Sequence, residues 1–174
     1  MDSVTQHQLA AIDGAVEDAS RHGRPLWLRG GWAIDFSLGR ITRAHEDVDW
    51  FALADDAEGL VRRLECAGWT ETPRAPLDQQ RDLVRDDVEF GIALLRIEDG
   101  RPYVAGGPFG GEPWPPTMIT RAMRRTLKGV TADVIGLEAQ IEIKQMMPTW
   151  VPQLVRRQKD QEDIRALQTL ASSR

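Results

Sequence analysis

Apolar residues recur along the first part of the chain at spacings that alternate between those of helices and those of strands. Leu9, Ile12, Val16 and Ala19 are three or four residues apart, which is typical of a helix with one buried face. Short apolar runs follow, of the kind found in buried strands. The predicted elements are a helix over residues 4–21, a strand over 26–28, a helix over 32–38, a strand over 48–53 and a helix over 55–67.

The middle of the chain is predicted to be extended. Trp69-Thr70 and residues 81–85 and 88–95 are strand candidates, and Asp86-Asp87 is suited to a turn between the last two. Residues 105–117 are rich in glycine and proline, which predicts a long loop of a kind that is often functional or mobile.

Helical spacing returns near the C-terminus. Residues 137–147 predict a helix that ends before Pro148, and Pro152 is suited to the first turn of a last helix. The whole pattern predicts an α/β fold, in which a small mixed sheet is flanked by helices and followed by a helical part. We therefore expect a main domain over residues 1–130 and a C-terminal helical region packed on it over residues 131–174.

Composition narrows the class of protein. The chain has 174 residues and one cysteine, Cys66, so no disulfide can form within it and nothing indicates an oxidising compartment. Because neither a leader-like N-terminus nor a long apolar run is present, we expect a cytoplasmic protein with no membrane partner. The net charge of −5 argues against nucleic-acid binding. It is compatible with a cationic small-molecule partner, but it is also ordinary for solubility.

Two carboxylates in the sequence His45-Glu46-Asp47-Val48-Asp49 are the first candidates for chemistry. On a strand, residues i and i+2 face the same side, so Asp47 and Asp49 would lie together and repel each other. A divalent cation relieves that repulsion, and magnesium prefers one or two carboxylates together with substrate phosphates. An Asp-x-Asp sequence alone, however, more often marks a solvated loop or a helix cap.

A glycine pair precedes these carboxylates. Gly30-Gly31 ends a predicted strand and enters a predicted helix, where exposed backbone amides favour anions such as phosphate. Such a pair alone is usually only a turn. Followed by Asp47 and Asp49 about sixteen residues later, it describes a phosphate site beside a metal site, as phosphoryl and nucleotidyl transfer require.

This part of the chain resembles a known group of enzymes, the small antibiotic nucleotidyltransferases. The matching motifs are Gly30-Gly31-Trp32-Ala33-Ile34-Asp35, Leu38-Gly39-Arg40, Thr42-Arg43 and His45-Glu46-Asp47-Val48-Asp49. They are similar to those of the aminoglycoside 2''-adenylyltransferase-like and lincosamide nucleotidyltransferase-like enzymes, within the DNA polymerase beta-like nucleotidyltransferase superfamily. The resemblance is strong over residues 28–50 and looser over residues 129–170, whereas residues 69–128 match poorly. It implies a nucleotidyltransferase fold, with residues 1–130 as the catalytic domain.

The resemblance also implies roles for individual residues. Gly30 and Gly31 would hold a nucleoside triphosphate, and Asp47 and Asp49 would bind magnesium. The superfamily has a third carboxylate on a later strand, and Glu89 matches it best, although glutamate departs from the usual aspartate. Glu89 would bind the metal or act as general base toward the acceptor hydroxyl.

Each of these assignments has an alternative. Glu89 could instead be a solvated residue on an edge strand, and Asp86 or Asp87 could supply the third carboxylate. Arg43 and Lys144 are candidates for contact with the nucleotide, but could also be ordinary surface charges.

The sequence therefore predicts an adenylyltransferase, an enzyme that transfers AMP from ATP, with Mg²⁺ as cofactor, to a hydroxyl of a small molecule. An aminoglycoside-like antibiotic is the first choice of acceptor because it is polycationic and the chain is acidic. A lincosamide-like acceptor is the alternative, and a less charged pocket would favour it. A non-catalytic relative, such as a toxin–antitoxin component that keeps the fold, is a further hypothesis. The oligomeric state does not follow from the sequence.

Overall fold

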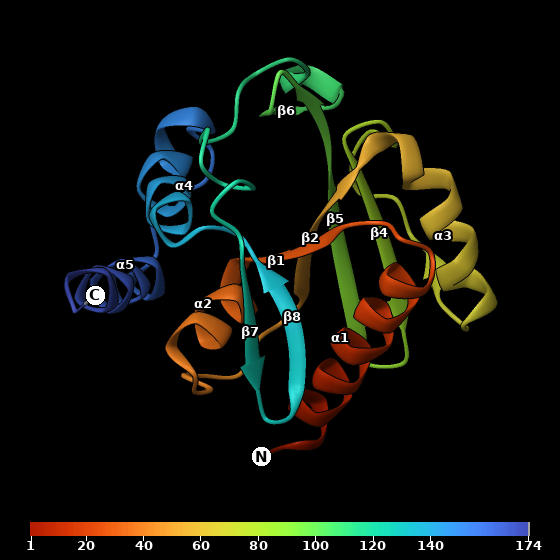
Figure 1. The fold of residues 1–174 in the computed structure, drawn as a ribbon, viewed down its shortest axis with the longest axis horizontal. Coiled ribbons are helices and arrows are strands. Elements are labelled where there is room, and N and C mark those ends of the chain that lie inside the picture. The colour runs from red at the N-terminus through yellow and green to blue at the C-terminus, as the bar shows by residue number, and fades with distance from the viewer. Residues whose placement is uncertain (174) are drawn as a thin grey trace.

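The computed structural model describes residues 1–173 as a mixed β-sheet with helices on both faces (Figure 1). The helices are α1 (Ser3–Arg21), α2 (Gly30–Leu38), α3 (Ala57–Cys66), α4 (Leu137–Trp150) and α5 (Gln158–Ser172), with short 3-10 turns at Ala54–Asp56 and Gly107–Phe109. The strands are β1 (Leu26–Arg29), β2 (Val48–Leu53), β3 (Thr70–Glu71), β4 (Gln80–Arg85), β5 (Val88–Glu98), β6 (Arg101–Val104), β7 (Met123–Leu127) and β8 (Val130–Val134).

The sheet has the strand order β3-β4-β5-β2-β1-β8-β7, and β6 pairs with the outer part of β5. β2 is antiparallel to β1 but parallel to β5, and β1 is parallel to β8. The sequence prediction of an α/β fold with a mixed sheet is therefore confirmed. The central strands β1 and β2 carry the residues just before Gly30 and just after Asp47, so the sheet brings the two predicted motifs together.

Alternation along the central strands produces two cores. Leu28 and Trp50 point to one face, where α1 and α3 cover them. Trp27 and Phe51 point to the other face and pack against Met118 and the segment that leads into α4. Successive strand residues face opposite sides, so the short apolar runs of the sequence supply both layers.

The C-terminal helices pack on α2. Ile34 of α2 is buried against Leu137 of α4 and Leu167 of α5, and Gln140 Nε2 donates to Ser37 Oγ over 3.0 Å. Figure 1 shows α4 and α5 together at one end of the sheet, away from α3. The region expected over residues 131–174 begins within β8, which belongs to the sheet, and then contains the two helices α4 and α5.

Two predictions about prolines were wrong. α4 continues through Pro148 to Trp150, because a proline near a helix end removes only one backbone donor and Val151 N still closes the last turn on Met147 O at 2.8 Å. The last helix begins at Gln158 rather than at Pro152. Its N-terminus is fixed by Asp160, whose side chain accepts from Arg157 N over 3.1 Å.

The hairpin of β7 and β8 was not predicted. Its outer strand is mostly polar and basic, so it lacks the apolar alternation of a strand with one buried face. The turn consists of Lys128 and Gly129, both with positive φ, as tight two-residue hairpin turns require. None of the helices within residues 1–173 has the length and apolarity to cross a lipid bilayer.

Candidate active site

The turn from β1 into α2 brings a glycine against a carboxylate. Gly30 directly follows Arg29 and has a φ of 69°, in the left-handed region that favours glycine. A Cβ atom at Gly30 would lie 2.5 Å from Asp49 Oδ2, which is too close for any side chain. Gly30 therefore allows the Asp49 carboxylate to approach the N-terminus of α2, where unpaired backbone amides favour anions.

Gly31 makes room for a different side chain. A Cβ atom at Gly31 would collide with Nδ1 and Cε1 of His45. His45 Nε2 donates to Asp35 Oδ2 over 2.7 Å, and Thr42 Oγ1 donates to Asp35 Oδ1 over 2.6 Å. Because Asp35 is fully buried in α2, these bonds anchor the segment that leads into β2.

Asp49 lies in a row of residues that crosses four strands. Its partners in register are Arg29 on β1 and Gly91 on β5, and Gly91 is in turn opposite Asp82 on β4. A Cβ atom at Gly91 would lie 3.1 Å from Asp49 Oδ1 and 4.0 Å from Asp82 Oδ1. The missing side chain at Gly91 thus leaves a gap that two carboxylates face.

Asp82 was not among the residues that the sequence singled out. It is buried, and its carboxylate accepts from Gln80 Nε2 at 2.6 Å and from Arg74 N at 3.0 Å. The alternation of the predicted strand over residues 81–85 could have given its face of the sheet. Only the pairing of β4, β5 and β2 places it opposite Asp49, and no local pattern reveals that pairing.

Asp47 and Glu89 come two residues before Asp49 and Gly91, the members of this row on β2 and β5. Val48 pairs with Phe90 in the parallel strands β2 and β5, so Asp47 and Glu89 precede matched positions. Partial loss of hydration, followed by the charges of Asp49 and Glu46, raises the pKa of Asp47 above its ordinary value. The carboxylates near the start of β2 and β5 are therefore not fully balanced by positive charge.

This charge imbalance suits a metal ion. Within residues 1–173, no three His, Cys, Asp or Glu side chains are close enough together to form a complete metal-binding group. Magnesium needs only one or two carboxylates when substrate phosphates supply other ligands, and Asp47 and Asp49 fit that requirement. Glu89 forms an ion pair with Arg74 at 2.7 Å and is 45% exposed. Its carboxylate is therefore engaged with Arg74 and not with the Asp47 and Asp49 pair.

Arg43 and Lys144, the two predicted nucleotide contacts, meet at one carboxylate of α5. Arg43 binds Asp163 through both guanidinium ends at 2.5 and 2.8 Å, and Lys144 Nζ lies 2.9 Å from Asp163 and 3.1 Å from Asp160. Burial of Asp163 opposes its ionisation, but the hydrogen bonds from Arg43 and Lys144 outweigh it and lower its pKa. The structure brings these two cations together and links them to the C-terminal helix.

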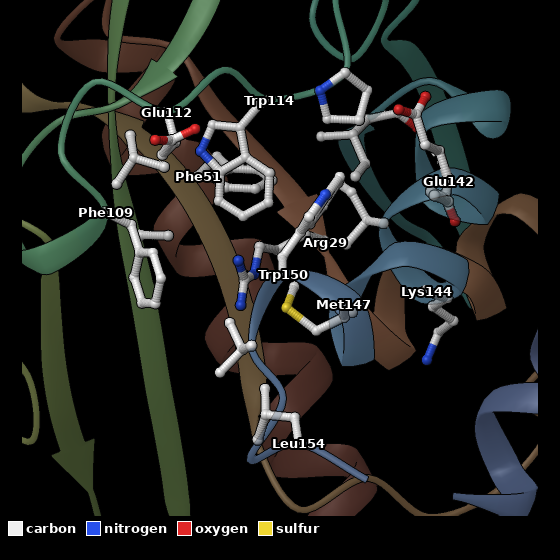
Figure 2. A pocket seen from close by; sticks show the side chains of 18 of the residues that line it. Arg29, Phe51, Phe109, Glu112, Trp114, Glu142, Lys144, Met147, Trp150 and Leu154 are labelled. Atoms are coloured by element: carbon white, nitrogen blue, oxygen red, sulfur yellow. Dashed lines mark hydrogen bonds between the residues drawn. The ribbon is translucent and has the colours of Figure 1, made fainter. Parts of the chain in front are cut away.

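A cavity of about 1240 Å³ opens beside the glycine turn, between the sheet, the loop after β6 and α4. Its wall is largely aromatic and apolar, and Trp114 lies between Phe51 and Trp150 with ring centroids 5.1 and 6.2 Å away. Figure 2 shows these side chains around Arg29, with Lys144 farther along the wall. Gly30 also lines the cavity, which therefore reaches the predicted phosphate site.

Comparison with known proteins relates most of the chain to one family. The model of the family described as aminoglycoside-2''-adenylyltransferase matches residues 12–167. Over 42 residues, the chain is 48% identical to proteins from Escherichia coli and Klebsiella pneumoniae named 2''-aminoglycoside nucleotidyltransferase. This stretch is 24% of this chain and 24% of each relative, so it spans about a quarter of the relatives' length.

Solved structures resemble the whole fold. The crystal structure of ANT(2'')-Ia in complex with adenylyl-2''-tobramycin has a TM-score of 0.67 and 22% identity, over 98% of this chain and 95% of that chain. The lincomycin-bound lincosamide antibiotic adenylyltransferase LnuA has a TM-score of 0.67 and 20% identity, over 88% and 92% of the two chains. At these identities, the similarity establishes the fold, and the fold is the one that the sequence predicted.

Proposed function

This chain belongs to the aminoglycoside-2''-adenylyltransferase family, and from that premise we propose that it transfers AMP from ATP, with magnesium, to a hydroxyl of an aminoglycoside-like antibiotic. The observation that carries the proposal is the Asp49 carboxylate, which lies against Gly30 at the N-terminus of α2, with Asp47 two residues before it in the chain. Members of the family are nucleotidyltransferases, and this arrangement provides an anion site and a cation site side by side.

In the proposed reaction, the acceptor oxygen forms a bond to the α-phosphorus of ATP while the bond from that phosphorus to pyrophosphate breaks. The amides that follow Gly30 would hold the phosphates, and Asp47 and Asp49 would hold magnesium. Bound magnesium would neutralise charge on the phosphates. Glu89 is the proposed acceptor of the hydroxyl proton, a role that requires its carboxylate to leave Arg74.

We assign Arg43 and Lys144 to the nucleotide side of the site. Lys144 lines the cavity, whereas Arg43 lies behind it and shares Asp163 with Lys144. Asp163 would thus hold Lys144 at the cavity wall, where its charge favours phosphate.

The lincosamide-like acceptor is supported by a separate observation, the lining of the cavity. Its charged residues are nearly balanced, with four cations against three carboxylates: Arg29, Arg101, Lys144 and Arg157 against Glu112, Glu142 and Asp160. A polycation would find no excess of negative charge there. The aromatic wall of Phe51, Trp114 and Trp150 suits an acceptor that carries an apolar group beside its hydroxyls.

The test is pyrophosphate release from ATP and magnesium with a panel of aminoglycosides and lincosamides. We expect release that depends on one of these classes of acceptor. If no acceptor causes pyrophosphate release, and ATP does not bind in the presence of magnesium, the chain would instead be a non-catalytic relative. Binding of ATP without release would leave the nucleotide site standing and reject both acceptor classes.

A further inference from the structure

Arg29 is a cation in the cavity wall that, within the described residues, has a buried, unpartnered Nε and only a long ion pair with Asp49. Its Nε is buried and has no hydrogen-bond partner among residues 1–173, and Asp49 Oδ1 lies 3.7 Å from its Nη2, beyond hydrogen-bond distance. The guanidinium carbon lies 4.9 Å from the centroid of the Phe51 ring, a contact that fixes the plane of the group without using its donors. Figure 2 shows Arg29 among Trp114, Trp150 and Met147.

Two of the three other cations that line the cavity in the described part of the chain are held by a carboxylate, and the third, Arg101, is exposed on β6. Lys144 lies 3.1 Å from Asp160, and Arg157 Nε also lies 3.1 Å from Asp160. A guanidinium has five N–H donors and cannot be deprotonated in a protein. Leaving such a group unsatisfied in a largely apolar wall is costly unless a ligand supplies the missing acceptors. Arg29 therefore points to an oxygen-rich, negatively charged ligand group.

We propose that Arg29 is a substrate-binding residue that takes a phosphate group of the nucleotide, an inference that rests on the proposed function. Arg29 immediately precedes Gly30, the first residue of α2, so its side chain and the amides of the helix N-terminus serve the same corner of the cavity. Its other neighbour is Asp49, one of the two proposed metal-binding carboxylates. The planar guanidinium matches two phosphate oxygens at once.

The positive charge of Arg29 also restricts where a cationic acceptor can bind in the cavity. A cationic amine cannot approach Arg29 closely without repulsion, because Asp49 is too distant for a hydrogen bond to the guanidinium and is also assigned to the metal. The positive groups of an acceptor must therefore lie away from the glycine turn. This position of Arg29 assigns the part of the cavity beside Gly30 to phosphate and the remainder of the cavity to the acceptor.

The experiment measures binding without turnover, by calorimetry with ATP, tripolyphosphate and adenosine as separate probes, each in the presence of magnesium. Replacing Arg29 by Gln should weaken ATP and tripolyphosphate about tenfold or more and leave adenosine within about twofold, since hydrogen bonds to charged groups are the strong ones. Arg29→Lys, which keeps the charge but loses the planar fork, should show a smaller loss. Arg101→Gln is the matched control, because Arg101 also lines the cavity but lies on β6, and it should change neither affinity.

Thermal unfolding of each variant shows whether it is folded, and Arg29→Lys decides the question should Arg29→Gln not fold. Equal tripolyphosphate affinity in the wild type and both Arg29 variants would overturn the assignment of Arg29 alone. An equal loss for adenosine would also overturn it, because the guanidinium would then act on the base. No tripolyphosphate or ATP binding by the wild type would overturn both this inference and the proposed function.

Discussion

At the scale of single residues, the candidate site contains functional side chains whose charged form the folded protein disfavours. Asp47 is the clearest case, because lost hydration and the charges of Asp49 and Glu46 raise its pKa. A raised carboxyl pKa means that the folded protein opposes ionisation at this position. Removing the charge should therefore help folding and harm function.

We expect Asp47→Asn to lower pyrophosphate release at least a hundredfold, the usual scale for losing a group that positions charge in a phosphoryl-transfer site. The variant should be slightly more stable at pH 7, by up to about 0.5 kcal/mol. The Asp47 carboxyl favours folding only while protonated, below its unfolded pKa of about 3.9. That contribution is lost as the pH rises through the raised folded pKa, so the stability gain should vanish below about pH 4.

Urea unfolding at pH 7 and pH 3.5 measures this effect, with Asp99→Asn as the control. Asp99 is exposed in the turn between β5 and β6, so its replacement should change neither activity nor the pH dependence. If Asp47→Asn were less stable than the wild type at pH 7, the folded protein would not oppose the ionisation of Asp47.

Replacing glycine by alanine should have opposite effects on stability at two positions. Gly31→Ala places a methyl group against the ring of His45 and should cost about 1–3 kcal/mol, as overpacking does. Gly14→Ala meets no atom within 4 Å in the middle of α1 and should gain about 0.5–1 kcal/mol. The two free energies of unfolding in urea give the comparison, and equal effects would show that His45 does not need the space above Gly31.

The sequence located most of these residues but not their neighbours. Asp47, Asp49 and Gly30 were found because they lie in short segments whose spacing carries meaning. Arg29 and Asp82 carry no such pattern, and their importance depends on pairing between strands that are distant along the chain. The presence of Glu89 near the site was expected, but its ion pair with Arg74 depends on a loop whose path no local pattern determines.

At the scale of elements, α5 is attached to the rest of the molecule through Asp163. The single carboxylate of Asp163 binds Arg43 from the segment before β2 and Lys144 from α4, and its side chain is only 4% exposed. The apolar contact of Leu167 with Ile34 supports the same attachment. The sequence predicted the apolar face of this helix but placed its start at Pro152, because capping by Asp160 competes with proline and is decided by geometry.

Asp163→Asn should destabilise the protein at pH 7 by about 2–4 kcal/mol, because two cations lose their buried partner. The Asp163 pKa is lowered in the folded protein, so its contribution is present above the unfolded pKa of about 3.9 and is lost as the pH falls through the folded pKa. The difference between wild type and variant should therefore shrink below about pH 4.

Asp133→Asn is the matched control, since Asp133 is 45% exposed and lies 3.8 Å from Arg124. It should change stability by less than about 0.5 kcal/mol at every pH. An Asp163→Asn deficit that stays constant down to pH 2 would show that the loss reflects packing rather than charge.

At the scale of the whole molecule, the C-terminal helices and the sheet share one apolar junction. We propose that residues 131–174 are a packed extension of the catalytic domain over residues 1–130, because Leu167 and Leu137 bury Ile34. The cavity lies across the same junction, with Phe51 from the sheet and Trp150 from α4. A unit of this kind should unfold in one step.

Leu167→Ala should cost about 2–5 kcal/mol and keep a single transition in calorimetry, with equal calorimetric and van't Hoff enthalpies. Val155→Ala, at a side chain that is 81% exposed, should leave the melting temperature nearly unchanged. Two separate transitions in the Leu167→Ala protein would contradict the single unit and indicate that α4 and α5 melt alone.

The pairing of β1 with β8 has a consequence for how the protein is made. Leu28 pairs with Val134, and of the strands between β1 and β8 along the chain only β7 lies on this side of β1, where it pairs with β8 itself. During synthesis, one edge of β1 must therefore stay open until β8 (Val130–Val134) has left the ribosome. Such late closure of a long loop slows folding and exposes a strand edge to other nascent chains. Stalled or shortened chains that end before β8 should therefore be the ones that need chaperones.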